Sequence, residues 1–135
     1  MDDKLTALTE AATAAREQAW APYSNFHVGA ALLTTDGQIF TGANVENSSY
    51  GLSVCAERIA VFKAVTAGQR EFAAIVIVTD TAIPTPPCGA CLQVMSEFAP
   101  TLQVHMVNLA GTSKSYTLNE LMPHGFSNSY LAGSK

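Results

Sequence analysis

The sequence predicts an α/β protein, a three-layer α/β/α sandwich around a mixed sheet of about five strands. Strand-like segments alternate with helix-like segments along the chain. Two β-compatible segments flank an Asp-Gly pair, which predicts a hairpin at the start of the sheet. Two later segments are almost continuously apolar, as is typical of strands covered on both faces. The 135 residues suit one domain, so we expect a single domain over residues 1–135.

The N-terminal part of the chain predicts one helix and the hairpin. Residues 3–20 are rich in Ala, Leu and Glu and carry apolar side chains at helical spacing, so they predict a helix. Residues 27–34 and 38–45 predict the two hairpin strands. Asp36-Gly37 between them favours a type I′ turn, because Gly supplies the positive φ that this turn needs.

The rest of the chain predicts helices and strands in alternation. Residues 54–67 predict a second helix, closed by Gly68 as its C-cap. The later elements are, in order, a buried strand at 72–79, a Pro-rich loop, a third helix at 89–98, a buried strand at 102–108, a short helix near 117–122 and a closing segment around Phe126 and Tyr130.

The composition is apolar for a soluble chain. Hydrophobic residues make up 48% and charged residues 13%, and the mean hydropathy is +0.18. No apolar run approaches the ~20 residues of a spanning helix, and the start at Met1 lacks a secretory pattern. We therefore expect a cytoplasmic protein with no membrane partner. The low charged fraction favours a homo-oligomer, in which sister subunits cover apolar surface.

The net charge and the cysteine count indicate which class of ligand and which kind of chemistry to expect. The net charge is −4 and the pI about 5.2, and the seven Lys and Arg residues are scattered rather than gathered in a stripe. This argues against a nucleic-acid partner and favours a small-molecule ligand. The three cysteines are an odd number in a chain without an export signal. They point to metal or nucleophilic chemistry rather than to disulfides.

All three cysteines fall at the starts of predicted helices. Cys55 opens the second helix, and Cys88 and Cys91 open the third. A spacing of three places Cys88 and Cys91 on the same helix face. The free amides and the dipole at a helix start favour the thiolate form that a metal needs. If the two helix starts face each other, three sulfurs can bind one zinc ion and leave its fourth position open for water, which is the catalytic arrangement.

Glu57 completes a known pattern. It follows Cys55 by two residues, so its side chain cannot point in the same direction as that of Cys55, but it can reach water at the metal from the side. Zinc deaminases carry a ligand, one residue and a glutamate, followed later by Pro-Cys-x-x-Cys, with the glutamate as general acid and base. Residues 55–57 (CAE) and 87–91 (PCGAC) match this pattern. We therefore predict a catalytic zinc site with Glu57 as its proton shuttle.

Other interpretations of the cysteines have to be weighed. Cys-x-x-Cys also occurs in redox proteins and in structural zinc sites. A structural site needs a fourth Cys or a His at close spacing, and no histidine lies within a few residues of a cysteine; the three are His27, His105 and His124. A redox motif leaves residues 55–57 unexplained. Burial as inert thiols is the usual alternative for one cysteine, but three at two helix starts argue against it.

Nearly the whole chain resembles the small homotetrameric cytidine deaminases of nucleoside salvage, in the cytidine/deoxycytidylate deaminase family. The matching segments are 23–26 (YSNF), 28–31 (VGAA), 44–47 (NVEN), 49–51 (SYG), 54–58 (VCAER), 87–91 (PCGAC) and 93–94 (QV). The resemblance implies one Zn²⁺ per chain, bound by the three cysteines. It also implies hydrolysis of cytidine and 2′-deoxycytidine to uridine and 2′-deoxyuridine plus ammonia, in a tetramer whose sites are shared between subunits.

The resemblance assigns roles in substrate binding. Phe26 packs against the pyrimidine ring, Asn44 and Glu46 hydrogen-bond a ribose hydroxyl, and the Ala56 backbone N–H donates to the pyrimidine carbonyl oxygen. A second set of residues lies near a neighbouring subunit's pocket or the 5′ end of the nucleoside: Phe126, Ser48 and Tyr50. Without the resemblance, the aromatic side chains would be interpreted as core or interface residues, and Asn44 and Glu46 as turn residues.

Arg58 has a role that follows from charge. Three thiolates around Zn²⁺ leave a net charge of −1, which weakens the effect of the metal on water. An arginine that donates hydrogen bonds to the sulfurs draws electron density from them. The resemblance implies this role for Arg58, and the alternative is an ordinary surface charge. The sequence departs from the family where Leu92 replaces an Arg, His27 a Pro and Ala43 a frequent Cys.

Rival functions remain open from the sequence. A deaminase of polynucleotides would share the chemistry, although the acidic pI argues against it. A zinc-stabilised oligomeric module without activity would keep the cysteines for structure alone. Relatives that act on other aminated heterocycles are a further alternative, against which the Asn44 and Glu46 pair favours nucleosides.

Overall fold

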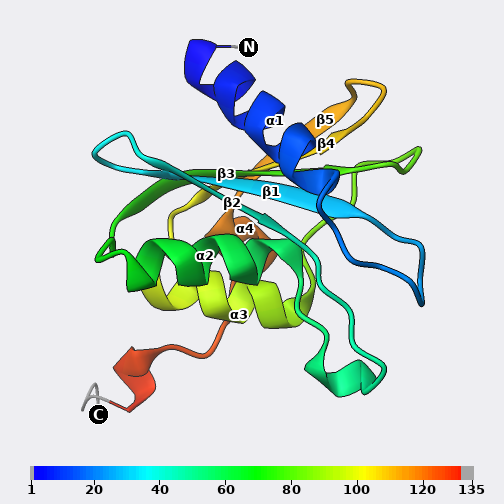
Figure 1. The fold of residues 1–135 in the computed structure, drawn as a ribbon. Coiled ribbons are helices and arrows are strands. Elements are labelled where there is room, and N and C mark those ends of the chain that lie inside the picture. Colours follow the sequence, from blue (N-terminus) through cyan, green and yellow to red (C-terminus); the bar gives the residue numbers. More distant parts are fainter. Residues whose placement is uncertain (1, 132–135) are drawn as a thin grey trace.

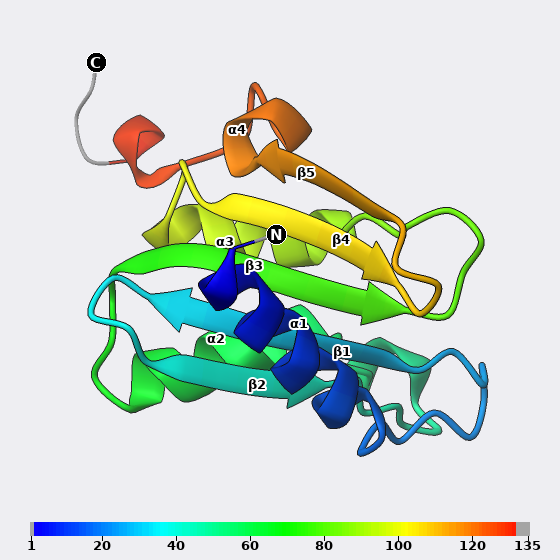
Figure 2. The ribbon, with the colours of Figure 1, turned by 90° about the horizontal axis from the view of Figure 1, so that it is seen from above.

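The computed structural model describes residues 2–131, and its centre is one five-stranded mixed sheet. The strands are β1 (Val28–Thr34), β2 (Ile39–Ala43), β3 (Phe72–Thr79), β4 (Gln103–Asn108) and β5 (Ser113–Thr117). Their spatial order is β2-β1-β3-β4-β5 (Figure 2). Only the β3–β4 pair is parallel among these strands. The predicted mixed sheet is confirmed.

Helices cover both faces of the sheet. Helix α1 (Asp3–Arg16) lies on one face, and α2 (Ala56–Thr66) and α3 (Gly89–Phe98) lie on the other (Figure 1). A short α4 (Leu118–Leu121) and the 3₁₀ turns η1 (Tyr50–Leu52) and η2 (Asn128–Tyr130) complete the described elements. This confirms the three-layer α/β/α arrangement. No helix within residues 2–131 has the length and apolar character needed to cross a membrane.

Strand β3 runs through the middle of the molecule and contributes to both cores. Ile75 and Ile77 belong to the cluster under α2 and α3, whereas Val76 and Val78 belong to the cluster under α1. Successive side chains of a strand point to opposite faces, so a strand between two helical layers must be apolar on both. The continuous Ile/Val run of the sequence therefore has the physical cause that was predicted for it.

Two local predictions need correction. The first helix ends at Arg16 rather than at residue 20, because the Trp20 backbone pairs with the chain after β2: its N–H donates to Asn44 O (2.9 Å), and its carbonyl accepts from Glu46 N (2.8 Å). The hairpin turn is not type I′, because Gly37 (φ 93°) has positive φ and Asp36 does not. The Thr34 hydroxyl instead donates to the Asp36 carboxylate.

The fifth strand was not located from the sequence. β5 has the sequence SKSYT, and four of its five residues are exposed at the edge of the sheet. An edge strand with mostly polar side chains gives no apolar alternation for pattern analysis to detect. Its pairing with β4 is what defines it.

Two glycines let helices lie directly on the sheet. A Cβ added to Gly42 in β2 would lie 2.3 Å from Ala56 O and 2.7 Å from Ala60 N, both in the backbone of α2. A Cβ added to Gly29 in β1 would lie 1.9 Å from Ala12 O in α1. Helix α2 is therefore fixed against β2 at the turn that follows Cys55.

We expect Gly42→Ala to destabilise the protein by about 1–3 kcal/mol, because the added methyl group must push α2 away from the sheet. Thermal unfolding measures this effect. Gly51→Ala is the control, because a Cβ at Gly51 meets nothing within 4 Å. Equal melting temperatures for the two variants would contradict this account of the α2–β2 contact.

Candidate metal centre and active site

The three cysteine sulfurs meet where the starts of α2 and α3 face each other. Cys55 and Cys88 are the N-cap residues of α2 and α3, and Cys91 lies in the first turn of α3. The Cys55 and Cys88 sulfurs are 3.8 Å apart, and those of Cys88 and Cys91 are 3.4 Å apart. All three lie within 4.8 Å of one another, and none forms a disulfide. Three thiols at this separation match the donor set of a tetrahedral zinc ion with one open position.

The electrostatics of the cluster favour a thiolate. The hydrogen bond with the Cys91 thiol, together with the Arg58 guanidinium, lowers the pKa of Cys55 to about 5. The same hydrogen bond and burial raise the pKa of Cys91, so the two thiols share a proton. A zinc ion replaces such a proton on binding.

Arg58 lies beside the sulfurs. Its Nη2 donates to the Cys55 sulfur at 3.6 Å, and this hydrogen bond raises the pKa of Arg58. Its buried Nε has no hydrogen-bond partner within the described protein. Leu92 is partly buried against the core under α2 and α3, so this position supplies packing and no charge.

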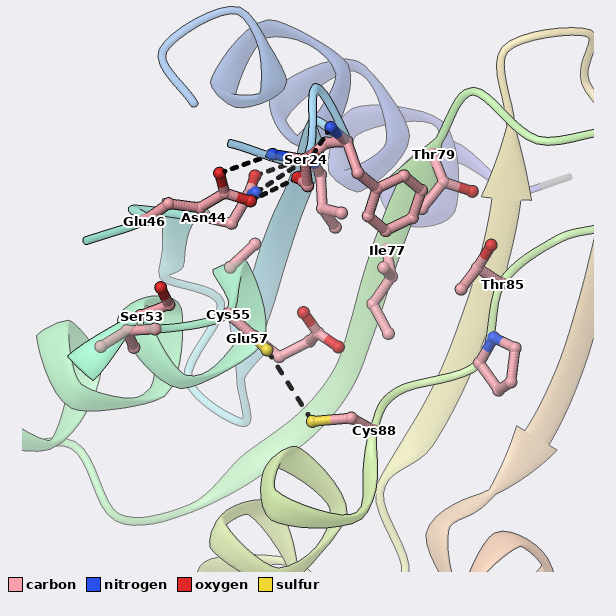
Figure 3. A pocket seen from close by; sticks show the side chains of 15 residues that line it. Ser24, Asn44, Glu46, Ser53, Cys55, Glu57, Ile77, Thr79, Thr85 and Cys88 are labelled. Carbon is pink, nitrogen blue, oxygen red and sulfur yellow. Dashed lines mark hydrogen bonds between the residues drawn. The ribbon is translucent and has the colours of Figure 1, made fainter. Parts of the chain in front are cut away.

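Glu57 lies in the first turn of α2 with only 4% of its surface exposed. It lines a cavity of about 360 Å³, together with Cys55 and Cys88, and its side chain points into the space beside their sulfurs (Figure 3). Burial raises the pKa of this carboxyl to about 7, and the negative charge of Cys55 adds to the effect. A carboxyl with a pKa near neutrality is suited to both accept and donate protons.

Asn44 and Glu46 line the opposite end of the cavity. Asn44 Oδ1 accepts from Val28 N (2.8 Å), and its Nδ2 donates to Phe26 O (2.7 Å). The Glu46 carboxylate accepts from the Tyr23 and Ser24 backbone N–H groups (3.0 and 3.1 Å) and from the Ser24 hydroxyl. Both side chains thus anchor the loop before β1 and leave one amide hydrogen and carboxylate lone pairs for a ligand.

The structure brings some of the other predicted residues to the cavity and not others. Phe26 and Ala56 line it, and Ala56 is the first residue of α2, where a backbone N–H has no partner within the helix. Ser48 is exposed and does not line this cavity. Tyr50 packs edge-on against Tyr23, with ring centroids 5.8 Å apart.

Phe126 also lies away from the cavity of its own chain. Its ring is 56% exposed and stacks on Tyr130 at 5.9 Å, and its carbonyl accepts from Gln93 Nε2 at 2.9 Å. The described chain therefore does not bring Phe126 or Ser48 to its own cavity, whereas Tyr50 lines an adjoining hollow together with Ser24 and Glu46. The predicted contacts of these three residues with a nucleoside stay predictions.

The cavity has lining residues that the sequence analysis missed. Ser24 lies next to Glu46, and Thr79 and Thr85 lie at the far end (Figure 3). Pro86 lines the cavity as well. One signal was available for Thr79: it is the last residue of a predicted buried strand, and ligands of α/β proteins bind at the carboxyl ends of such strands. No signal was available for Thr85, which lies in the loop between β3 and α3.

Comparisons with known proteins agree with this geometry. The family model described as the cytidine and deoxycytidylate deaminase zinc-binding region matches residues 2–107. A cytidine deaminase from Halalkalibacterium halodurans is 52% identical over 120 residues, which is 88% of this chain and 91% of that protein. A blasticidin-S deaminase from Bacillus cereus is 36% identical over 105 residues, covering 72% of this chain and 74% of that protein.

A solved structure extends the similarity to the fold. The crystal structure of cytidine deaminase from Burkholderia pseudomallei has a TM-score of 0.89 and 55% sequence identity, covering 93% of this chain and all of that chain. Both the zinc-binding region and the sequence identity extend over most of the chain. The chain belongs to the cytidine and deoxycytidylate deaminase family.

Proposed function

We propose that this chain is a zinc-dependent deaminase that hydrolyses cytidine and 2′-deoxycytidine to uridine and 2′-deoxyuridine plus ammonia, in pyrimidine salvage. The observation that carries the proposal is the juxtaposition of a buried glutamate and three sulfurs in one cavity. The other end of that cavity offers an amide and a carboxylate suited to a sugar hydroxyl. Named relatives of high identity support the same activity.

Cys55, Cys88 and Cys91 would hold the zinc ion, whose chemistry is to acidify water next to the substrate. Glu57 accepts a proton from that water and passes it to N3 of the pyrimidine, which makes C4 electrophilic. The water oxygen adds to C4. Glu57 then delivers the second proton to the exocyclic amine, the C4–N bond breaks, and ammonia leaves. One glutamate serves as base and acid in turn, which suits a carboxyl with a pKa of about 7.

The other residues that line the cavity bind the nucleoside in this proposal. Asn44 and Glu46 bind the ribose hydroxyl with the hydrogen-bonding capacity that the loop contacts leave free. Phe26 packs on the ring, and the Ala56 N–H donates to the carbonyl oxygen at C2.

The proposal also covers the organisation of the chain, with one domain over residues 1–135. The exposed aromatic side chains, among them Phe126 and Tyr50, fit subunit contacts in a cytoplasmic homotetramer with shared sites.

Spectroscopic detection of uridine formed from cytidine tests the proposal, with and without a zinc chelator. We expect chelation to abolish turnover and added Zn²⁺ to restore it, because the three sulfurs alone cannot acidify water. Blasticidin S as an alternative substrate and RNA as a competitor test the rival substrate classes. A protein that contains zinc but releases no ammonia from cytidine would instead be the zinc-stabilised module without activity.

A further inference from the structure

Three threonine hydroxyls form a chain at the end of the cavity away from Asn44 and Glu46. The Thr79 and Thr81 oxygens are 2.9 Å apart, and those of Thr81 and Thr85 are 3.0 Å apart. The Thr81 hydroxyl also lies 2.6 Å from the carbonyl oxygen of Ile83. Thr79 and Thr85 line the cavity, opposite Asn44 and Glu46 and with Glu57 and the sulfurs between (Figure 3).

The direction of each hydrogen bond follows from the number of protons. A hydroxyl has one hydrogen and two lone pairs, and a carbonyl oxygen can only accept. The hydrogen of Thr81 therefore goes to Ile83 O. Thr81 can then only accept from its two neighbours, so Thr79 and Thr85 must donate to it. The three hydrogen bonds occupy the hydrogen and both lone pairs of the Thr81 hydroxyl. They also occupy the hydroxyl hydrogens of Thr79 and Thr85.

The backbone around Thr81 is held independently of these hydroxyls. Asn108, which is 5% exposed, donates through Nδ2 to Thr81 O (3.0 Å) and Ala82 O (3.1 Å), and its Oδ1 accepts from Thr112 N (2.8 Å). The loop after β3 is thereby tied to the end of β4. Loss of one threonine hydroxyl should consequently leave the loop in place, so that its effect on a ligand can be measured separately.

With their hydrogens committed to Thr81, Thr79 and Thr85 can offer only lone pairs to the cavity. These two hydroxyls can accept hydrogen bonds from a group that carries N–H or O–H hydrogens, but they cannot donate a hydrogen bond to a carbonyl oxygen. Thr79 is 1% exposed, so water reaches its hydroxyl only through the cavity. A mismatched ligand would leave these acceptors unsatisfied, and an unmade hydrogen bond in a buried site is costly.

We propose that Thr79 and Thr85 accept hydrogen bonds from the exocyclic amino group of the pyrimidine, and that Thr81 is the positioning residue that fixes both as acceptors. The inference rests on the proposed function, which places the sugar at the Asn44 and Glu46 end and C4 of the ring beside Glu57, so that the exocyclic amino group extends from C4 toward the threonine end. The site then selects the aminated substrate over the product, which carries a carbonyl oxygen at C4 and no hydrogen there.

The test compares cytidine and uridine in zinc-loaded protein. Calorimetry in the Glu57→Gln background, in which turnover is slowed, gives the Kd values of both nucleosides, and kcat/KM for cytidine is measured with Glu57 intact. We expect Thr85→Val to weaken cytidine binding and lower kcat/KM by about 5- to 20-fold, the worth of one hydrogen bond. Uridine affinity should change by less than about twofold, since uridine makes no such hydrogen bond.

Thr81→Val gives the more specific result. It removes the acceptor of two hydrogens, so Thr79 and Thr85 become free to donate into the cavity, and uridine binding should become about 3- to 10-fold tighter. Thr13→Val is the matched control. Thr13 lies on α1, across the sheet from the cavity, and its hydroxyl donates to Thr9 O at 2.7 Å. This variant should change neither affinity.

Two results overturn the inference. An unchanged ratio of uridine Kd to cytidine Kd in Thr85→Val would make the Thr85 hydroxyl a support of the loop alone. Uridine binding that is unchanged or weaker in Thr81→Val would contradict the positioning role. Wild-type protein that binds cytidine in preference to uridine but releases no ammonia would defeat the proposed function and leave the inference standing.

Discussion

Replacement of Glu57 by Gln should reduce kcat for cytidine by about 10²–10⁴-fold while one zinc ion per chain remains bound. Gln has the shape of Glu but cannot accept the proton of the attacking water or return it to the amine. The side chain is 4% exposed, so no solvent base can take its place from outside. Steady-state kinetics and zinc analysis of the same sample measure the two effects together.

The control for this variant is Glu10→Gln, which removes an exposed carboxylate from α1 on the opposite face of the sheet. It should leave both kcat and zinc content unchanged. If Glu57→Gln kept activity within tenfold of wild type, Glu57 would not be the proton shuttle. If it lost zinc as well as activity, its role would be in the metal site rather than in proton transfer.

The second large effect is expected from Cys88→Ala. Loss of one of three thiols should remove zinc at equilibrium and lower deaminase activity by at least about 10³-fold, because two remaining ligands cannot hold the ion and no acidified water remains. Cys88 is the N-cap of α3 and makes no capping hydrogen bond, so the change acts through the metal rather than through helix stability. Zinc analysis and the cytidine assay measure both consequences.

Ala90→Ser is the matched control, since Ala90 is exposed in the same turn of α3, between Cys88 and Cys91. We expect it to keep zinc and activity. A Cys88→Ala protein that is fully metallated and active would refute the ligand assignment. A Cys88→Ala protein whose thermal unfolding matches that of metal-free wild type would show that the loss is due to the missing ion alone.

Much of the fold could be predicted because its signals are local. Strand β3 and helix α3 were predicted over the residues that form them, 72–79 and 89–98, since a run of Ile and Val and a helical repeat of apolar residues depend only on neighbouring positions. The end of α1 and the turn at Asp36 were wrong, because both depend on partners elsewhere. Trp20 pairs with residues 44–46, and the hydroxyl of Thr34 holds Asp36.

The candidate site also has a part that local sequence predicts and a part that depends on distant contacts. Cys55 and Glu57 are neighbours on one helix start, and Cys88 and Cys91 share another, so each half of the metal site is encoded by spacing alone. The contacts of Asn44 and Glu46 with the loop before β1 were not predicted. They connect residues 16 to 23 positions apart in sequence, and nothing in either segment indicates the pairing.

By itself, the sequence determined the chemistry: three thiols, one glutamate and the helix starts that activate them, all through contacts within a few residues. Only the tertiary structure decided how these groups meet. It brings Cys55 within 3.8 Å of Cys88 across 33 positions, and it buries Glu57 until its pKa reaches about 7. It also sets Thr79, at the end of β3, and Thr85, in the loop that follows, at the far end of the cavity. Distance, burial and hydrogen-bond direction arise from packing between distant segments, and no local pattern encodes them.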